Sequence, residues 1–237
     1  TLFWYGKGDN SEIRKLLFKS VDHVHNLRHD YLNSRAEILN VNVDVLFDLK
    51  GWTINHYQAL FSLRAAPIQI TFLGFAGGTQ NPCMDYLIAD NVVAKNKEHF
   101  SETLVQMEHG FMPFGSEVTI SSPVFQRKDF GLPENQIIAA VCVATDKLTQ
   151  ELFLAWTRCF KKVKNSCLWI LSSRPEDRQQ IRKLWLSQGL SMDRLHFQRK
   201  PSTRDSGFLS KQEHLARISL ADLVLDSWVY NGHSSTV

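Results

Sequence analysis

The sequence predicts an α/β protein made of two units, in each of which parallel strands alternate with helices. In the second half, continuous apolar runs with the length of buried strands are separated by amphipathic helical segments. The first half carries similar apolar runs. Between the halves, residues 115–135 collect glycine, proline and serine, which is typical of an interdomain connection. We therefore predict a first domain over residues 1–120 and a second over 121–237.

The second half has the clearer pattern. The apolar run at 137–143 predicts a buried strand, and Thr145 or Asp146 can cap a helix that begins near Lys147. The elements expected after it are a strand at 167–171, a helix at 175–188 stopped by Gly189, a strand at 195–197, a helix at 211–220 capped by Ser210, and a strand at 223–225. This alternation is typical of a doubly wound parallel sheet.

The first half is less regular. Apolar runs at 43–49, 68–75 and 86–88 predict three strands. They favour a second α/β unit of the same general kind.

Composition excludes several classes of protein. With 43% hydrophobic and 22% charged residues in 237, the chain can bury a full core, which excludes a disordered or fibrous protein. A net charge of +3 without long Lys/Arg runs gives no sign of a nucleic-acid partner. No apolar stretch is long enough to span a membrane, so we expect a soluble, cytoplasmic protein, with the nucleus as a second compartment.

The four cysteines carry no metal or disulfide pattern. Cys83, Cys142, Cys159 and Cys167 include no CxxC pair and no matched Cys/His spacing. We expect buried, reduced thiols and no metal site.

Chemistry is expected in the loops after the strands, because doubly wound sheets bind ligands outside the carboxyl ends of their strands. Lys147 follows the first strand of the second half, where its ammonium would add to an anion site at a helix start. A solvated lysine is the alternative. Residues 231–235, the sequence Asn-Gly-His-Ser-Ser, follow the last strand and offer hydroxyls and a ring nitrogen to phosphate oxygens. A plain polar turn is the alternative there.

His214 and Arg217 are one helical turn apart, so they share a face of the helix expected at 211–220. Stacking on a base or reading its edge is one interpretation of this pair. An ordinary surface histidine is the other.

Several short segments, in this order, are similar to the catalytic region of the O-linked N-acetylglucosamine transferases, including the SPINDLY branch. They are Gly51-Trp52-Thr53, residues 63–69 (LRAAPIQ), residues 72–75 (FLGF), residues 84–90 (MDYLIAD), residues 165–169 (NSCLW), residues 213–226 (EHLARISLADLVLD) and Asn231-Gly232-His233. The shared order and spacing extend over most of the chain, which makes coincidence a poor explanation.

The resemblance implies two Rossmann-like lobes of the GT-B glycosyltransferase type, both incomplete in this chain, with a nucleotide-sugar bound mainly by the C-terminal lobe. It assigns Lys147 to the donor pyrophosphate as the catalytic residue. It assigns the donor-binding residues Lys211, His214, Arg217, His233, Ser234 and Ser235, of which the first three contact the uracil and its surroundings and the last three form the phosphate-side loop. It places Leu73 and Gly74 on the sugar and acceptor side.

The implied reaction is an inverting transfer of N-acetylglucosamine from UDP-GlcNAc to Ser/Thr hydroxyls of proteins, with no metal and no cofactor. The implied partners are therefore a UDP-sugar and protein acceptors, with neither nucleic acid nor membrane. The chain departs from the family pattern where Asp146 precedes the lysine, where it would repel phosphate, and where Lys50 replaces an asparagine before Gly51. The family's N-terminal histidines, its helical repeats and the ribose-binding carboxylate after the His233 loop are missing from these 237 residues, which suggests a fragment.

These departures leave two alternatives open. One is an inactive homologue that acts as a binding scaffold. The other is a related protein fucosyl- or glucosyltransferase on the same scaffold, although the segment 211–214 favours uracil over guanine by resemblance.

Overall fold

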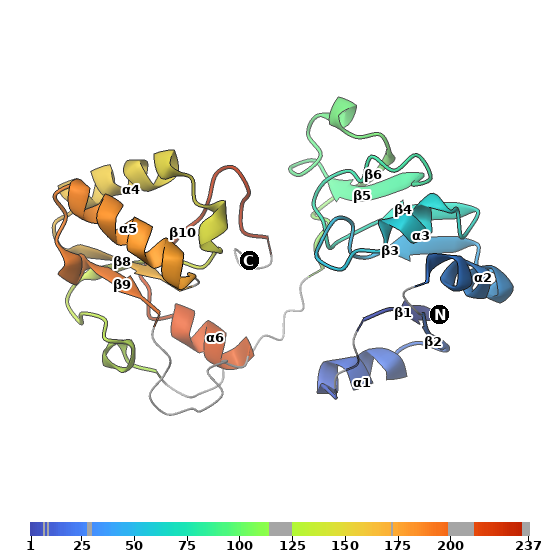
Figure 1. Ribbon diagram of the computed structural model, residues 1–237, viewed down its shortest axis with the longest axis horizontal. Coiled ribbons are helices and arrows are strands. Elements are labelled where there is room, and N and C mark those ends of the chain that lie inside the picture. Colours follow the sequence, from blue (N-terminus) through green and yellow to red (C-terminus); the bar gives the residue numbers. More distant parts are fainter. Residues whose placement is uncertain are drawn as a thin grey trace. The chain divides into compact units, whose positions relative to one another are not determined.

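The computed structural model describes residues 1–6, 8, 10–27, 30–113, 125–171, 173–198 and 211–233, with the backbone alone of Lys211. The chain divides into two compact units, Thr1–Gly115 (unit 1) and Ser116–Val237 (unit 2), each shown in Figure 1. In both units parallel strands combine with helices, so the predicted α/β class is confirmed.

Unit 1 contains two separate parallel sheets. β1 (Leu2–Trp4) pairs with β2 (Val24–Asn26) in one, and the other has the strand order β3-β4-β5-β6. The strands of the larger sheet are β3 (Val45–Asp48), β4 (Ile68–Thr71), β5 (Tyr86–Asp90) and β6 (Thr103–Met107). The helices are α1 (Glu12–Lys19), α2 (Tyr31–Val41), α3 (Gln58–Ser62) and the 3₁₀ turn η1 (Lys97–His99). The three strands predicted in this half are therefore confirmed.

Helices α2 and α3 cover one face of the larger sheet. Leu46 of β3 points to this face and packs in one buried cluster with Ile38 of α2 and Phe61 of α3. Side chains alternate between the faces of a strand. Val45 and Phe47, which flank Leu46, therefore point the other way, and they are 39% and 46% exposed.

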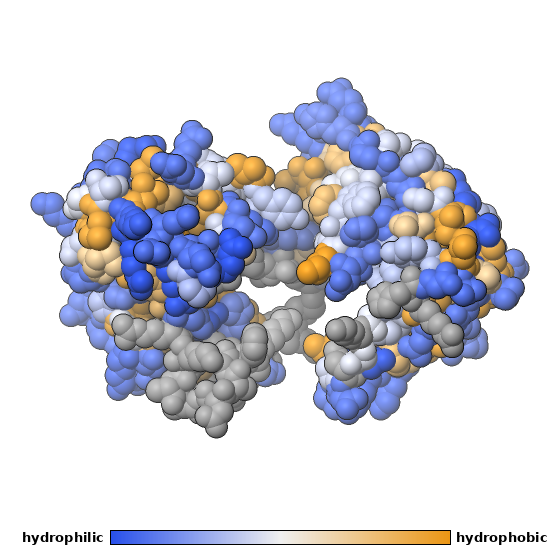
Figure 2. Space-filling view, in the orientation of Figure 1, coloured by the Kyte–Doolittle hydropathy of each residue, from blue (hydrophilic) through white to orange (hydrophobic). Residues whose placement is uncertain are grey.

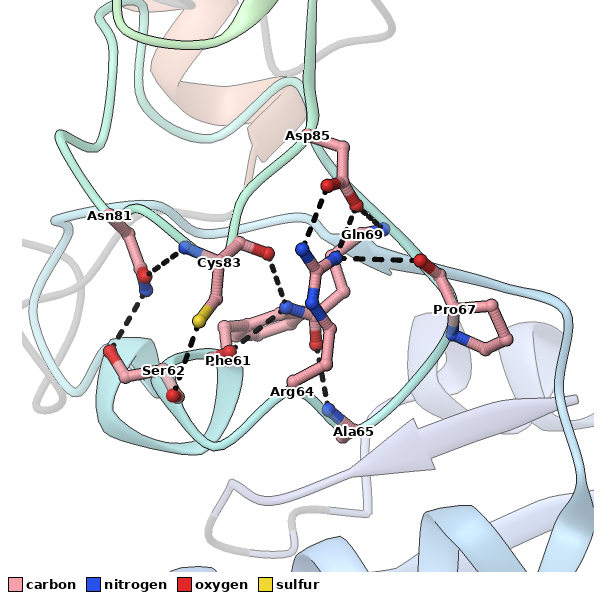
Figure 3. Close-up of polar contacts among 9 residues, drawn as sticks. All are labelled: Phe61, Ser62, Arg64, Ala65, Pro67, Gln69, Asn81, Cys83 and Asp85. Atoms are coloured by element: carbon pink, nitrogen blue, oxygen red, sulfur yellow. Dashed lines mark hydrogen bonds and ion pairs between the residues drawn. The ribbon is translucent and has the colours of Figure 1, made fainter.

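A buried amide fixes the connection between α3 and β4. Gln69 is 0% exposed, and its side chain accepts a hydrogen bond from Ala65 N and donates one to the Phe61 carbonyl (Figure 3). Beside it, Arg64 forms a two-pronged ion pair with Asp85 (Figure 3). Leaving a buried amide unsatisfied costs about 1–3 kcal/mol. The segments 63–69 and 84–90, which carry the family resemblance, thus hold each other in place.

Unit 2 forms one parallel sheet with the order β10-β7-β8-β9. Its strands are β7 (Ile137–Val141), β8 (Ser166–Ile170), β9 (Leu195–Phe197) and β10 (Leu223–Leu225). Its helices are α4 (Gln150–Lys162), α5 (Pro175–Ser187) and α6 (Lys211–Ile218), with the 3₁₀ turns η2 (Arg127–Phe130), η3 (Thr145–Lys147) and η4 (Met192–Arg194). All four strands predicted in this half are confirmed.

Both faces of this sheet are covered. Helices α4 and α5 lie on one side, where Val141 packs with Phe153 and Trp185, and α6 lies on the other (Figure 1). On that second side Trp169 of β8 packs against Phe130 of η2. Parallel sheets are normally buried on both faces, and unit 2 follows this rule.

The predicted start of α4 is wrong. The helix begins at Gln150, and its N-cap is Thr149, whose hydroxyl accepts a hydrogen bond from Leu152 N at 3.2 Å. The residues before Thr149 form the separate turn η3, closed by the hydrogen bond from Lys147 N to Ala144 O at 3.1 Å. Lys147 therefore precedes the helix and does not belong to its first turn. The predicted cap Ser210 lies outside the described residues.

The four cysteines are free thiols, but they do not share one environment. Cys167 is buried, Cys83 and Cys142 are partly buried, and Cys159 is exposed. The expectation of buried thiols is wrong for Cys159, because that residue lies on the solvent side of α4. Among the described residues, no group of His, Cys, Asp or Glu is placed to hold a metal ion. No described helix is both long and apolar enough to cross a bilayer.

Candidate functional site

The order in which the chain adds strands to the sheet of unit 2 reverses at β7. The chain runs from β7 outward through β8 to β9 and then returns to place β10 on the other side of β7. In doubly wound sheets this reversal opens a crevice at the carboxyl ends of the two strands, and ligands bind there. The loops that follow β7 and β10 therefore define the candidate site, and they contain Lys147 and His233.

Lys147 contacts the loop after β10. Its ammonium lies 4.3 Å from the centre of the Tyr230 ring, within cation–π range. Burial, followed by the Lys147 charge, lowers the pKa of His233. The structure thus brings together two residues that the sequence analysis selected separately. It adds Tyr230, which that analysis did not select.

The carboxylate of Asp226 closes the loop after β10. Its Oδ1 accepts hydrogen bonds from Ser227 N and Gly232 N, both at 2.7 Å. Within the loop, Asn231 Nδ2 donates to the Ser227 carbonyl at 2.6 Å. These bonds set the direction in which the chain leaves Gly232 toward His233.

A second group of side chains lies on α6. Arg217 is only 6% exposed, and burial lowers the pKa of its guanidinium to about 10. It contacts the side chains of Gln198 and His214. Because a guanidinium only donates, Nδ1 of His214 accepts, and the ring proton lies on Nε2. Burial, and then the Arg217 charge, lowers the pKa of His214, so its neutral form is favoured.

Charges from both groups act on Cys142, which directly follows β7. Burial raises the pKa of this thiol, and the charges of Arg217 and Asp226 act on it with opposite signs. Residues from α6 and from the loops after β7 and β10 therefore converge at the carboxyl end of the sheet. Ser234 and Ser235 lie outside the described residues, as does the side chain of Lys211, whose backbone begins α6.

Asp146 and Lys50, the two residues that depart from the family pattern, each interact with a nearby side chain. Asp146 is exposed, and its charge helps to raise the pKa of the Arg174 guanidinium after the larger contribution of Asp177. In unit 1, the Lys50 ammonium lies 5.7 Å from the centre of the Tyr5 ring.

The predicted residues of unit 1 lie in a strained turn after β4. Leu73 has φ of 76°, in the left-handed region that a bulky residue rarely adopts. A Cβ on Gly74 would stand 2.3 Å from the Leu49 carbonyl oxygen, so only glycine fits against the loop after β3. This turn ends β4 at Thr71, well before the predicted limit at Phe75.

A buried carboxylate that the sequence analysis did not select organises the loop after β3. Asp48 is 1% exposed, accepts hydrogen bonds from Lys50 N and Gly51 N, and contacts Gln58 Nε2. Gly51, with φ of 54°, makes the turn. An aspartate that ends an apolar strand three residues before a glycine was the available signal, because such side chains bind nearby N–H groups.

Comparison with known proteins assigns the chain to a family. The family model described as glycosyl transferase family 41 matches residues 2–116 and 112–237, which together cover nearly the whole chain. The chain belongs to glycosyl transferase family 41. The expected relationship to the O-linked N-acetylglucosamine transferases is confirmed at the level of the family.

Named relatives agree with this assignment. The family-41 chain is 28% identical over 235 residues to an Arabidopsis thaliana protein named as the probable UDP-N-acetylglucosamine–peptide N-acetylglucosaminyltransferase SEC, covering 96% of the chain and 23% of that protein. It is 26% identical over 196 residues to the SPINDLY protein of the same plant, covering 82% of the chain and 21% of that protein. The chain thus spans about a quarter of the length of these relatives.

A solved structure shows the same fold. An O-GlcNAc transferase mutant from Thermobaculum terrenum superposes with a TM-score of 0.81 at 18% identity, covering 98% of this chain and 43% of that one. The predicted fold, two Rossmann-like units of the GT-B type in a partial chain, is confirmed.

Proposed function

We propose that this chain is part of a protein O-linked N-acetylglucosamine transferase, which moves the sugar from UDP-GlcNAc to Ser/Thr hydroxyls of proteins. The observation that carries the proposal is the meeting of Lys147, Tyr230 and His233 at the switch point of unit 2. The names of the family-41 relatives support the donor and the acceptor class.

The proposed chemistry is an inverting displacement. The acceptor hydroxyl oxygen bonds to the anomeric carbon while the bond from that carbon to the phosphate oxygen breaks. The hydroxyl proton passes to a base, and UDP leaves with the bonding electrons. Negative charge then grows on the diphosphate, and a preorganised cation is the standard means of stabilising it. We assign Lys147 this catalytic role without a metal.

Of the remaining assignments, that of His214 follows from the direction of its ring donor, and the others follow from the resemblance of their segments to the family. His214, neutral with its proton on Nε2, can donate to a base carbonyl, and Arg217 holds that tautomer in place. Lys211, on the same helix, is assigned to the nucleotide. His233, with Ser234 and Ser235 after it, is assigned to the phosphate side, and Leu73 and Gly74 to the sugar and acceptor side. The proposed location is the cytoplasm, with the nucleus as a second compartment.

Calorimetric titration tests the donor site. The protein in its full encoded length is titrated with UDP, GDP and UDP-GlcNAc, before and after Lys147→Ala. Losing one charged hydrogen bond costs about 1.5–3 kcal/mol, so we expect UDP affinity to fall roughly ten- to a hundredfold. Lys161→Ala is the matched control, because Lys161 lies at the far end of α4 and contacts Gln188.

Each titration result has a distinct meaning. Preference for GDP would move the assignment to a fucosyltransferase. No binding of any nucleotide would overturn the donor site and favour a binding scaffold. UDP binding that survives Lys147→Ala would remove that residue from the phosphate.

A further inference from the structure

A side-chain hydrogen bond attaches the turn η3, which carries Lys147, to α5. Thr145 is the first residue of η3, and its Oγ1 donates to Oδ2 of Asp177. Asp177 lies in the first turn of α5. The bond therefore joins residues that are 32 positions apart in the chain and that belong to the segments after two neighbouring strands, β7 and β8.

The backbone on both sides of η3 is held in the core. Val143 and Leu148 belong to the same apolar cluster of unit 2, Val143 as a buried member and Leu148 as a partly buried one. Between them, two backbone hydrogen bonds donated by Lys147 N and Leu148 N close the turn, each at 3.1 Å. The turn can therefore tilt only as one piece about its two ends, and the side-chain bond of Thr145 sets that tilt.

Thr145 and Lys147 leave this turn toward different neighbours. In the sheet, β7 lies between β8 and β10. Asp177, which accepts the Thr145 bond, follows β8, whereas Tyr230, which contacts the Lys147 ammonium, follows β10. Because the turn moves as one piece, a tilt that carries Thr145 away from α5 also moves the Lys147 side chain relative to Tyr230.

An open groove of about 570 Å³ lies beside this bond. Thr145 and Asp177 both line it, together with side chains from the start of α4 and from along α5. Figure 2 shows mainly hydrophilic side chains over α5. The attachment of η3 to α5 is therefore a polar contact at the rim of the groove, and removing it should leave the buried core in place.

Arg174 keeps the carboxylate of Asp177 charged and oriented. Its Nε and Nη2 donate to the two carboxylate oxygens at 2.9 and 3.2 Å. The bond from Arg174, and then the bond from Thr145, lowers the pKa of Asp177. A hydrogen bond to an ionised acceptor is stronger than one between neutral groups. The carboxylate is therefore a strong, oriented acceptor for the Thr145 hydroxyl at neutral pH.

We propose that Asp177 is a positioning residue for Lys147. It fixes the tilt of η3 through Thr145, and so it holds the Lys147 ammonium beside Tyr230, in the place from which it meets the donor diphosphate. The last step rests on the proposed function, whereas the control of the Lys147 position by Asp177 does not.

Substitution of Thr145 tests this role by calorimetric titration of the full encoded protein with UDP. Thr145→Val keeps the shape and neutrality of the side chain and removes the donor hydroxyl. We expect UDP affinity to fall roughly three- to tenfold. Thr145→Ser keeps the hydroxyl and should restore binding. Thr157→Val is the matched control, because the Thr157 hydroxyl donates to the Leu154 carbonyl within α4 at 2.8 Å.

Two double variants separate positioning from a general structural effect. Asp177→Ala should lose as much UDP affinity as Thr145→Val, and the double variant no more than either, because both changes remove one bond. In Lys147→Ala, adding Thr145→Val should change UDP affinity by less than about twofold. Equal losses with and without Lys147, or additive losses at Thr145 and Asp177, would overturn the proposal.

The imidazole of His233 gives a second readout that needs no nucleotide. The Lys147 charge lowers the pKa of His233, after the larger effect of burial. Thr145→Val changes no charge, so it should raise this pKa only by letting the ammonium move away, in the same direction as Lys147→Ala. Titration by NMR measures both shifts. An unchanged or lower pKa in Thr145→Val would overturn the proposal, whereas a raised pKa in a protein that binds no UDP would support the positioning and overturn the donor site instead.

Discussion

The ammonium of Lys147 lies over the ring of Tyr230, two residues that are far apart in the chain and adjacent at the edge of one sheet. The ring occupies one side of the ammonium and leaves its other N–H groups available to an anion. This contact fixes the direction of a long, flexible side chain before any ligand arrives.

Removing the Tyr230 ring should weaken nucleotide binding. A cation–π contact at an exposed site is worth about 0.5–1 kcal/mol, so we expect Tyr230→Leu to lower UDP affinity roughly two- to fivefold by calorimetry. Tyr230→Phe keeps the ring and should bind as the unmodified protein does. Tighter binding in the leucine variant would show that the ring competes with phosphate for Lys147.

Opening the loop after β10 should weaken the site without unfolding unit 2. Asp226→Ala removes the acceptor for Ser227 N and Gly232 N, and we expect roughly tenfold weaker UDP binding. Asp226→Asn keeps a carbonyl oxygen in the same place and should lose much less. Circular dichroism establishes that both variants are folded. Equal losses in the two variants would mean that the negative charge, and not the hydrogen bonds, maintains the loop.

Acid should destabilise unit 2 through two histidines. The pKa of His214 and the pKa of His233 are both lowered in the folded state, mainly by burial. As pH falls below about 6.5, the unfolded chain takes up protons that the folded chain does not, so stability decreases toward the lowered values. Tm measured from pH 7.5 to 5.5 should therefore fall, and the double variant His214→Gln, His233→Gln should fall less. His99→Gln, at an exposed position in unit 1, is the control, and equal slopes in both variants would exclude this origin.

A methyl group at Gly74 should destabilise unit 1. The Cβ of Gly74→Ala would stand 2.3 Å from the Leu49 carbonyl oxygen, so backbone must move, at a cost of roughly 1–3 kcal/mol. Gly110→Ala is the control, because its Cβ would meet only Asp90 Oδ2 at 4.0 Å and should change stability by less than about 0.5 kcal/mol. Urea unfolding of both variants measures the difference. Equal stabilities would show that the turn at Leu73 and Gly74 adapts freely.

The sequence was informative where local signals agree and uninformative where competing or distant groups decide. The apolar runs that form β7 and β8 predict buried strands without ambiguity, because both strands are buried on both faces and so consist of apolar residues almost throughout. The start of α4 was missed because Thr145 and Thr149 are equally good caps, and only the fold selects Thr149. The contact between Lys147 and Tyr230 leaves no trace in either segment. It arises from the pairing of β7 with β10, which no local pattern reports.

Unit 2 builds its candidate site on the most exposed strand of its described sheet. β10 has three residues at one end of the sheet, and Leu223 and Val224 remain 43% and 45% exposed. It follows β7, β8 and β9 in the chain, so the crevice between β7 and β10 forms only when β10 docks on these three strands. Local opening of β10 would carry Tyr230 and His233 away while β7, β8 and β9 stay packed. A nucleotide that contacts both Lys147 and the loop after β10 would then stabilise the docked form of β10. Its binding would therefore make local opening of this one strand rarer.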